Sequence, residues 1–221
     1  QSHAALLGEL DLIGKETRAN PTLANRIRHK FKIKNTTGYS LNALVDFTDP
    51  VDILAHLMIG SEGTLGFISR ITYRTVVEDP CKASALVFFP TIEAACEAVI
   101  RLKPQPVSAV ELLDRPALRS VQDKAGLPPL IKTLGDGAAA LLIEVRAPDR
   151  AELEEKMAAA LGALEGIATV EPPRFSTDPA VCDMYWKVRK GTFPSVGAMR
   201  RTGTTVIIED VAFPVADLAA A

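Results

Sequence analysis

From residue 81 onward, short apolar segments alternate with helices that carry their own start signals. We predict helices after Thr91 and Asp149, which are suitable N-cap residues, and a further helix that begins at Asp178-Pro179; Glu152 gives Asp149 the spacing of a capping box. The predicted strands between and after these helices are 83–89, 107–113, 139–145, 169–171 and 204–213. Five strands interleaved with helices predict an α+β sandwich of the split-βαβ, ferredoxin-like kind.

The first 80 residues are organised differently. They predict helices at 4–15, 21–28 and 51–59, and strands at 30–34 and 67–77, which are too few strands for an independent sheet. The polar break Glu78-Asp79-Pro80 separates this region from the rest. We therefore predict two partial domains, 1–80 and 81–221, and expect the chain to be an internal piece of a longer protein.

Charge and cysteine usage exclude several classes of protein. The 25 basic and 27 acidic residues give a net charge of −2, which argues against a nucleic-acid binder despite Lys30, Lys32 and Lys34. The three cysteines are scattered and only three histidines are present, so we predict reduced thiols and no metal site. No apolar run approaches the roughly 20 residues of a membrane span, and the first residues do not resemble a signal peptide. We expect a cytoplasmic protein, with a peripheral position at the inner membrane as a further option.

The stretch GSEGTLG, residues 60–66, concentrates three glycines in a short loop before the predicted strand 67–77. Glycines permit positive φ angles and let a ligand approach the main chain. The loop lacks the Gly-Lys-[Ser/Thr] of a phosphate-binding P-loop, which argues against an NTP-binding protein, and it lacks the helix that follows a Rossmann glycine motif. On composition alone, a tight turn and a cofactor loop are equally compatible with it.

The longer string GSEGTLGFISRITYRTV resembles the flavin-binding loop of the FAD-linked oxidases related to vanillyl-alcohol oxidase. In that family the loop and the following strand lie along the FAD. One departure is Ser69, where relatives usually have Thr. The resemblance implies FAD contacts at Ser61, Glu62, Gly63, Gly66 and Ile68.

A second string, KNTTGYSL at residues 34–41, resembles the K-x-x-T-G-Y-D-L element of the same family. That element lies beside the flavin ring and the substrate. Two departures are Ser40, which replaces the usual Asp, and Ile33, where several relatives place an Arg. The resemblance implies that Lys34 and Thr37 contact the substrate. The FAD contacts that it implies are Asn35, Thr36, Gly38 and Tyr39.

The region after residue 80 resembles the substrate (cap) domain of these oxidases. YWKVR at 185–189 matches its W-x-x-R helix, and EDVAFP at 209–214 matches its E-D-V-A-x-P strand. The implied architecture is the C-terminal part of a vanillyl-alcohol-oxidase-type FAD-binding domain, followed by a truncated ferredoxin-like cap domain. Arg189 has two open interpretations, a contact with a substrate acid or a structural salt bridge. We expect Arg200 and Arg201 in a solvated loop and His56 as a packed or capping residue.

The resemblance implies an FAD-dependent dehydrogenase that oxidises a D-2-hydroxy acid of the lactate, glycolate or 2-hydroxyglutarate type by hydride transfer to flavin. The string RKGTFPSVGAMRRTGTTVIIEDVAFP is closest to a branch with an iron–sulfur half, so an iron–sulfur partner or a quinone is the expected electron acceptor. We expect the general base and the ADP-binding loop to lie outside these 221 residues, and the isolated chain to bind FAD weakly or not at all. The alternative is a non-catalytic, ferredoxin-like ligand-binding or assembly module that retains the loop.

Overall fold

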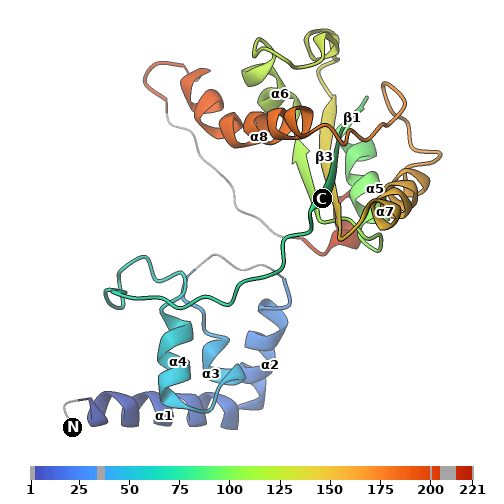
Figure 1. Cartoon of the computed structure of the whole chain (residues 1–221). Helices are drawn as coiled ribbons and strands as arrows, with labels where there is room; N and C mark the ends of the chain where they lie inside the picture. The colour runs from blue at the N-terminus through green and yellow to red at the C-terminus, as the bar shows by residue number, and fades with distance from the viewer. Residues whose placement is uncertain (1–2, 34–37, 200, 205–212, 221) are drawn as a thin grey trace. The chain divides into compact units, whose positions relative to one another are not determined.

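The computed structural model describes residues 3–33, 38–199, 201–204 and 213–220, which divide into two compact units between Thr75 and Val76. Each unit has its own hydrophobic core, helical in the first and built on a sheet in the second. Figure 1 labels most of the helices and strands of both units. None of the helices in the described ranges is long and apolar enough to cross a membrane.

The first unit is a small helical cluster around Leu10, Leu44 and Ile53. Asn20 caps α2, because its side chain accepts a hydrogen bond of 3.1 Å from the backbone N–H of Leu23. The helices of this unit are α1 (Ala4–Ala19), α2 (Pro21–Lys30), α3 (Ala43–Asp46) and α4 (Pro50–Leu57).

Two residues of α1 explain how the helices of this unit pack. A Cβ atom at Gly14 would lie 2.9 Å from Cδ1 of Ile53, so the glycine lets α4 approach α1 closely. One turn further on, Arg18 donates hydrogen bonds to the carbonyl oxygens of Leu44 (2.8 Å) and Phe47 (2.7 Å). The guanidinium thereby satisfies carbonyl groups at the end of α3 that have no partner within the helix.

The predicted strand at 30–34 is wrong for the residues that the structure describes. The helix α2 continues through Lys30, and the chain then turns, with the Phe31 N–H donating to the carbonyl of Ile27. The alternating pattern arises because Phe31 packs on the core formed by Ala24, Ile27 and Val45. Lys34 lies outside the described residues.

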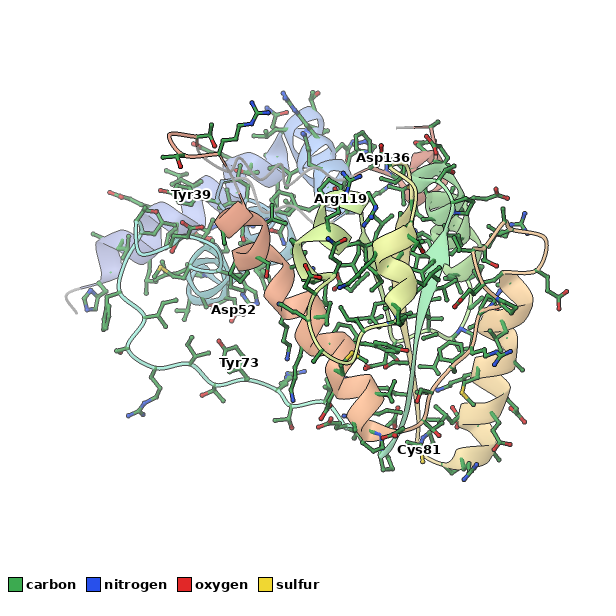
Figure 2. All side chains as sticks on the ribbon, turned by 90° about the horizontal axis from the view of Figure 1, so that it is seen from above. Tyr39, Asp52, Tyr73, Cys81, Arg119 and Asp136 are labelled. Carbon is green, nitrogen blue, oxygen red and sulfur yellow. The ribbon has the colours of Figure 1, made fainter. Side chains whose placement is uncertain are left out.

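The predicted strand at 67–77 is also wrong, because the segment has neither helical nor strand structure. Phe67, Val76 and Val77 are 92%, 90% and 91% exposed, and Tyr73 (labelled in Figure 2) is exposed as well. Residues with high strand propensity form a strand only where a neighbouring strand can pair with them. No strand in the described part of the chain pairs with this segment.

The second unit is built on a three-stranded antiparallel sheet in the order β1-β3-β2. Its strands are β1 (Cys81–Phe89), β2 (Ala109–Leu113) and β3 (Ala139–Ala147). The helix α5 (Ile92–Leu102) connects β1 to β2, and β3 lies between these two strands. This is a split-βαβ unit, and the predicted α+β class is confirmed.

Helices cover both faces of the sheet (Figure 1). On one face, α5 and α7 (Arg150–Ala163) pack on alternate residues of β1 and β3, including Val87, Leu141 and Ile143. On the other face lie α6 (Arg115–Val121), the 3-10 helix η1 (Pro129–Thr133) and α8 (Pro179–Met199). Because side chains of a strand alternate between faces, the polar residues Glu111 and Glu144 lie on the α6 and α8 side.

The helix boundaries in this unit follow the predicted signals closely. Thr91 accepts a hydrogen bond from the N–H of Ala94, and Asp149 accepts one from the N–H of Glu152. Gly166, which ends the turn after α7, has a φ of 78°, a conformation that a glycine adopts without strain. The helix predicted after Asp178 is confirmed as α8, whose sequence also contains Pro194.

The described residues contain three of the five predicted strands. The segment 169–171 is not a strand, although the Val170 N–H donates a hydrogen bond to the carbonyl of Phe88 at the free edge of β1. Further along the same edge, the backbones of Ser176 and Ser84 are hydrogen-bonded to each other. Pro172 and Pro173 lie between these contacts and have no N–H, so a continuous ladder cannot form. The predicted strand 204–213, with the string EDVAFP, falls largely on residues 205–212, outside the described part. A 3-10 helix, η2 (Val215–Asp217), follows it.

Candidate functional site

The glycine-rich stretch 60–66 forms two tight turns directly after α4. Gly60, Glu62 and Gly63 have φ angles of 74°, 51° and 80°, so three of four consecutive residues are in the left-handed region. The turns are closed by the Ser61 N–H, which donates to the carbonyl of Met58, and by Thr64, which donates to the carbonyl of Ser61 through its N–H (2.9 Å) and its hydroxyl (2.6 Å). The loop therefore has a defined conformation that two glycines make possible.

The structure brings the two motifs of the first unit together. The Tyr39 hydroxyl lies 3.0 Å from the Thr64 hydroxyl, and the Ser40 hydroxyl donates a hydrogen bond of 2.8 Å to the carbonyl of Ile59. Tyr39 is labelled in Figure 2. Gly38, which precedes it, has a φ of 76°. Of the first motif, Lys34, Asn35, Thr36 and Thr37 lie outside the described residues.

The main chain of the loop is open to its surroundings at two glycines. A Cβ atom built at Gly60 or at Gly63 would meet nothing within 4 Å, so the surface over both residues is open. Ser61 is the buried residue of the loop, with 3% of its surface exposed, and its main chain takes part in both turns. Backbone N–H groups in left-handed turns can bind anionic or polar ligands, so this loop can contact a cofactor through its backbone.

The last residue of the loop and the segment that follows it differ in their surroundings. A Cβ atom at Gly66 would lie 3.2 Å from the Cε atom of Met58, so Gly66 sits against that side chain. Ile68 is 45% exposed and extends into the uncovered segment. Gly66 is thus covered by a side chain, whereas Ile68 has apolar surface available for a ligand.

His56 is held by a residue at the end of α3 and by its own helix, α4. Its ring stacks on Phe47 with the centroids 3.8 Å apart, and its Nδ1 lies 2.8 Å from the carbonyl oxygen of Asp52. These contacts confirm the prediction of a packed residue. They occupy one face of the ring and its Nδ1 atom.

In the second unit, Arg189 of α8 forms an ion pair with Glu111 of β2. Its Nε donates a hydrogen bond of 2.8 Å to Oε2 of Glu111, and its Nη2 lies 2.8 Å from the same oxygen. The salt-bridge interpretation of Arg189 therefore describes this contact. Sequence reasoning missed Glu111, although a charged residue within the short apolar strand AVELL was a usable signal. Arg201 is exposed, in keeping with the predicted solvated loop, and Arg200 lies outside the described part.

Two aromatic residues precede Arg189 on α8. Burial raises the pKa of the Tyr185 hydroxyl, and the nearby Cys182 adds to the shift. The indole N–H of Trp186 is buried without a hydrogen-bond partner among the described residues. Trp186 lines a hollow beside the sheet whose other polar residues include Lys82, Glu144 and Lys190.

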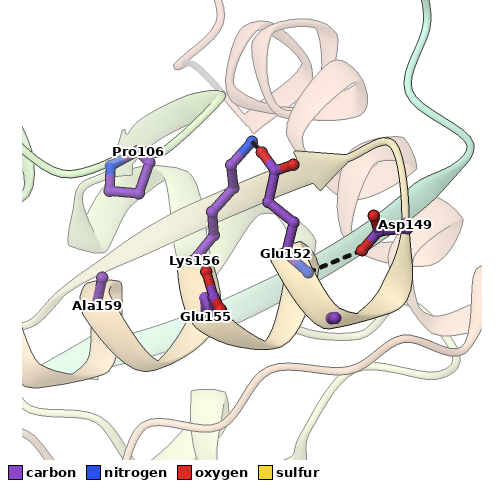
Figure 3. A pocket seen from close by; sticks show the side chains of 7 residues that line it. Pro106, Asp149, Glu152, Glu155, Lys156 and Ala159 are labelled. Carbon is purple, nitrogen blue, oxygen red and sulfur yellow. Dashed lines mark hydrogen bonds and ion pairs between the residues drawn. The ribbon is translucent and has the colours of Figure 1, made fainter.

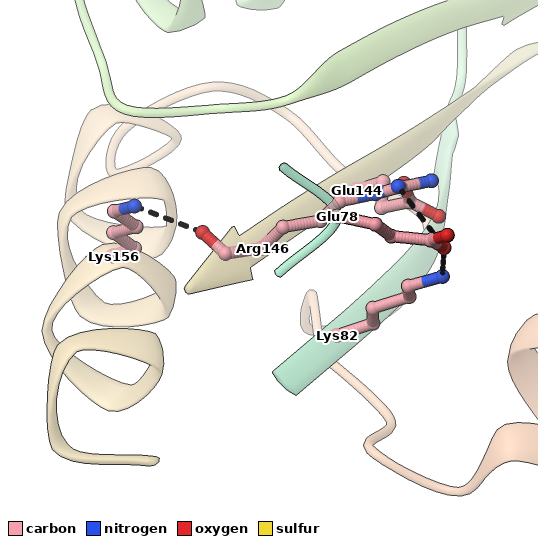
Figure 4. A network of polar contacts seen from close by, with 5 residues as sticks. All are labelled: Glu78, Lys82, Glu144, Arg146 and Lys156. Atoms are coloured by element: carbon pink, nitrogen blue, oxygen red, sulfur yellow. Dashed lines mark hydrogen bonds and ion pairs between the residues drawn. The ribbon is translucent and has the colours of Figure 1, made fainter. Parts of the chain in front are cut away.

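A polar network joins β1 and β3 on the face of the sheet that α8 covers (Figure 4). Arg146 pairs with the buried Glu144 and lies 3.7 Å from Glu78, which also pairs with Lys82. The Lys82 ammonium, which donates a hydrogen bond to the Glu78 carboxylate, lowers the pKa of that group, and the charge of Arg146 lowers it further. These charges are largely paired with each other, so the network connects the start of β1 to the end of β3.

The hollow on α7 in Figure 3 has a structural explanation. Lys156 pairs with Glu152 at 2.8 Å and donates a second bond to the carbonyl of Arg146. Asp149 caps the helix. Because these charged groups already have partners in the helix and the sheet, we assign no ligand to the hollow.

The chain is similar to a known protein family and to several known proteins. Residues 79–221 match the family described as FAD linked oxidases, C-terminal domain. The chain is 31% identical over 135 residues to a D-lactate dehydrogenase of Archaeoglobus fulgidus, a match that covers 60% of the chain and 27% of that protein. It is 28% identical over 172 residues to the mitochondrial D-lactate dehydrogenase [cytochrome] of Arabidopsis thaliana, which covers 75% of the chain and 28% of the relative.

A third relative is the glycolate oxidase subunit GlcD of Bacillus subtilis, which is 27% identical over 172 residues. This match covers 75% of the chain and 34% of the relative. The chain therefore spans about a quarter to a third of the length of these three proteins.

Proposed function

The chain belongs to the family of FAD-linked oxidases, and on that premise we propose that it is part of an FAD-dependent dehydrogenase of a small D-2-hydroxy acid. The names of its relatives, D-lactate dehydrogenase and glycolate oxidase, support this substrate class. The observation that carries the proposal is the contact between Tyr39 and Thr64, because it joins the two motifs that resemble flavin-binding elements. D-lactate, glycolate and D-2-hydroxyglutarate are the candidate substrates.

The open glycine loop fits a flavin. The open space over Gly60 and Gly63 lets a flat ring system approach the main chain, which a side chain at either position would obstruct. We propose that Glu62, Gly63 and Gly66 contact FAD, with Ser61 contributing through its main chain and Ile68 through apolar contact. Gly38 and Tyr39 would flank the same surface, together with Asn35 and Thr36 of the undescribed part of the motif.

The substrate carboxylate needs a cation, and Arg189 is our candidate within the second unit. An arginine binds a carboxylate through two parallel N–H groups, which fixes the orientation of the acid as well as its charge. Lys34 and Thr37 are further candidates and lie outside the described residues. When bound, FAD would accept the hydrogen of the substrate α-carbon as hydride. We assign no general base to the described residues.

The architecture that follows from this function is a division of labour between two partial domains. We propose that residues 1–80 are part of a flavin-binding domain and that residues 81–221 are part of a ferredoxin-like substrate domain, both within a longer enzyme. The electron acceptor would be an iron–sulfur domain or a quinone, in the cytoplasm or at the inner membrane surface.

The test uses the full-length protein that contains this chain. We expect it to carry flavin and to reduce an artificial electron acceptor when it is supplied with one of the D-2-hydroxy acids, and to be inactive with the L-enantiomers of the chiral substrates. Turnover with none of the three acids would contradict the proposed substrate class. A folded full-length protein that contains no flavin would contradict the proposed cofactor and favour a non-catalytic module.

A further inference from the structure

The ion pair between Glu111 and Arg189 uses one particular edge of the guanidinium. Both Nε and Nη2 lie 2.8 Å from a single oxygen, Oε2 of Glu111. These two nitrogens form the side edge of the guanidinium plane. The adjacent end edge consists of Nη1 and the second N–H of Nη2, and the described residues offer no hydrogen-bond acceptor to Nη1.

The Glu111–Arg189 pair is only partly buried. The side chain of Arg189 is 39% exposed and that of Glu111 is 37% exposed, so the pair lies at the surface of this unit. Arginine binds a carboxylate through either of its edges with similar geometry. A guanidinium held by a protein carboxylate on its side edge can therefore receive a second carboxylate on its end edge.

Both partners stand on rigid elements. Glu111 is paired with Leu142 in the register of β2 and β3, and Arg189 follows the buried Val188 on α8. The pair joins residues 78 positions apart, unlike the pair Glu97–Arg101, which is local to α5. A half-exposed ion pair contributes little to folding stability, whereas a fixed orientation of a binding group can have a large effect on catalysis.

We propose that Glu111 is a positioning residue, which holds the Arg189 guanidinium so that its end edge receives the carboxylate of the hydroxy-acid substrate. This inference rests on the proposed function. Glu111 itself does not touch the substrate. Its negative charge also restricts the site to one carboxylate bound on the outer edge, because a carboxylate approaching the side edge would meet Glu111.

The test compares Glu111 variants of the flavin-containing full-length protein. Glu111→Ala releases the guanidinium, and we expect KM for the hydroxy acid to rise by about tenfold or more, with a smaller change in kcat. Glu111→Gln keeps an amide oxygen that can accept both N–H bonds, so KM should stay within about threefold of the wild type. KM for the artificial electron acceptor should not change in either variant.

A double mutant separates positioning from a general structural effect. If Glu111 acts through Arg189, then Glu111→Ala combined with Arg189→Ala should raise KM no further than Arg189→Ala alone. The matched control is Glu97→Ala, which removes an ion pair with Arg101 elsewhere in the same unit and should leave KM unchanged. If Glu111→Ala does not fold, Glu111→Asp keeps the charge but withdraws the carboxylate by one methylene group, and should also raise KM.

The outcomes distinguish this inference from the proposed function. An unchanged KM in Glu111→Ala, or in Glu111→Asp where that variant replaces it, would overturn the inference while the wild type remains a hydroxy-acid dehydrogenase. Additive effects in the double mutant would also overturn it. A wild-type protein that carries flavin but oxidises none of the 2-hydroxy acids would instead overturn the proposed function.

Discussion

The segment 67–77 and the strand β1 were both predicted as strands and have different structures. The segment 67–77 contains six β-branched and two aromatic residues, whereas β1 contains one β-branched and two aromatic residues. In β1, every residue has a partner on β3, and Phe89 is fully buried. In 67–77, Phe67 is 92% exposed and no described strand lies alongside. Strand propensity therefore indicates that a segment can form a strand. Whether it does depends on a neighbouring strand elsewhere in the protein that pairs with it.

The largest expected effect comes from truncating one phenylalanine in each segment. Phe89→Ala should lower the free energy of unfolding by about 3–5 kcal/mol, because it leaves a cavity in a packed core. Phe67→Ala in the same chain should change it by less than about 0.5 kcal/mol, because the side chain is exposed. Urea denaturation of the 221-residue chain measures both values. A cost above about 2 kcal/mol for Phe67→Ala would show that the segment is packed after all.

A substitution at the free edge of β1 should lower the free energy of unfolding by a smaller amount. The Ser176 N–H donates a hydrogen bond of 2.8 Å to the carbonyl of Ser84, a residue that is fully buried. Ser176→Pro removes this donor and should cost about 1–3 kcal/mol, since the buried carbonyl loses its partner. Ser176→Ala is the matched control, because it keeps the N–H and removes only the hydroxyl. Equal unfolding free energies for the two variants would contradict a role for this edge contact.

The smallest effect concerns Glu78, which lies between the two segments. Lys82 and Arg146 lower the pKa of Glu78 in the folded state, so its ionised form stabilises the fold above the pKa of the unfolded chain, about 4.3 for glutamate. This contribution is lost as the pH falls through the lower, folded-state pKa. We therefore expect Glu78→Gln to lower the thermal midpoint slightly at pH 7 and to have no effect at acidic pH. A difference between variant and wild type that is the same at both pH values would argue against this ion pair.

Local signals predicted the second unit well. The caps at Thr91 and Asp149 and the apolar strands around them are determined by neighbouring residues, so the sequence alone located β1, β3, α5 and α7. The errors had two kinds of cause. A strand at 67–77 would need a pairing strand, and none in the described part of the chain pairs with it. At 30–34 and 169–171 nearby residues favour another structure, because Phe31 packs on α2 and because Pro172 and Pro173 interrupt a strand.

The candidate site shows the same division. Glycines with positive φ angles were predictable from the sequence GSEGTLG, because few other residues adopt that conformation without strain. The hydrogen bonds that join the loop to Tyr39 and Ser40 depend on how the chain returns through α3 and α4, which no local pattern specifies. The same holds for Glu111, whose partner Arg189 is 78 residues away.

The most direct test of this account is the flavin content of the full-length protein with Gly63→Ala. Gly63 and Gly166 both have positive φ angles, 80° and 78°, and open space where a Cβ would lie, so alanine costs similar backbone strain at each. Only Gly63 belongs to the proposed flavin loop. We predict that Gly63→Ala loses most of the bound flavin, measured by visible absorbance per protein, while Gly166→Ala retains it. Full flavin content in a folded Gly63→Ala variant would contradict the assignment of this loop to the cofactor.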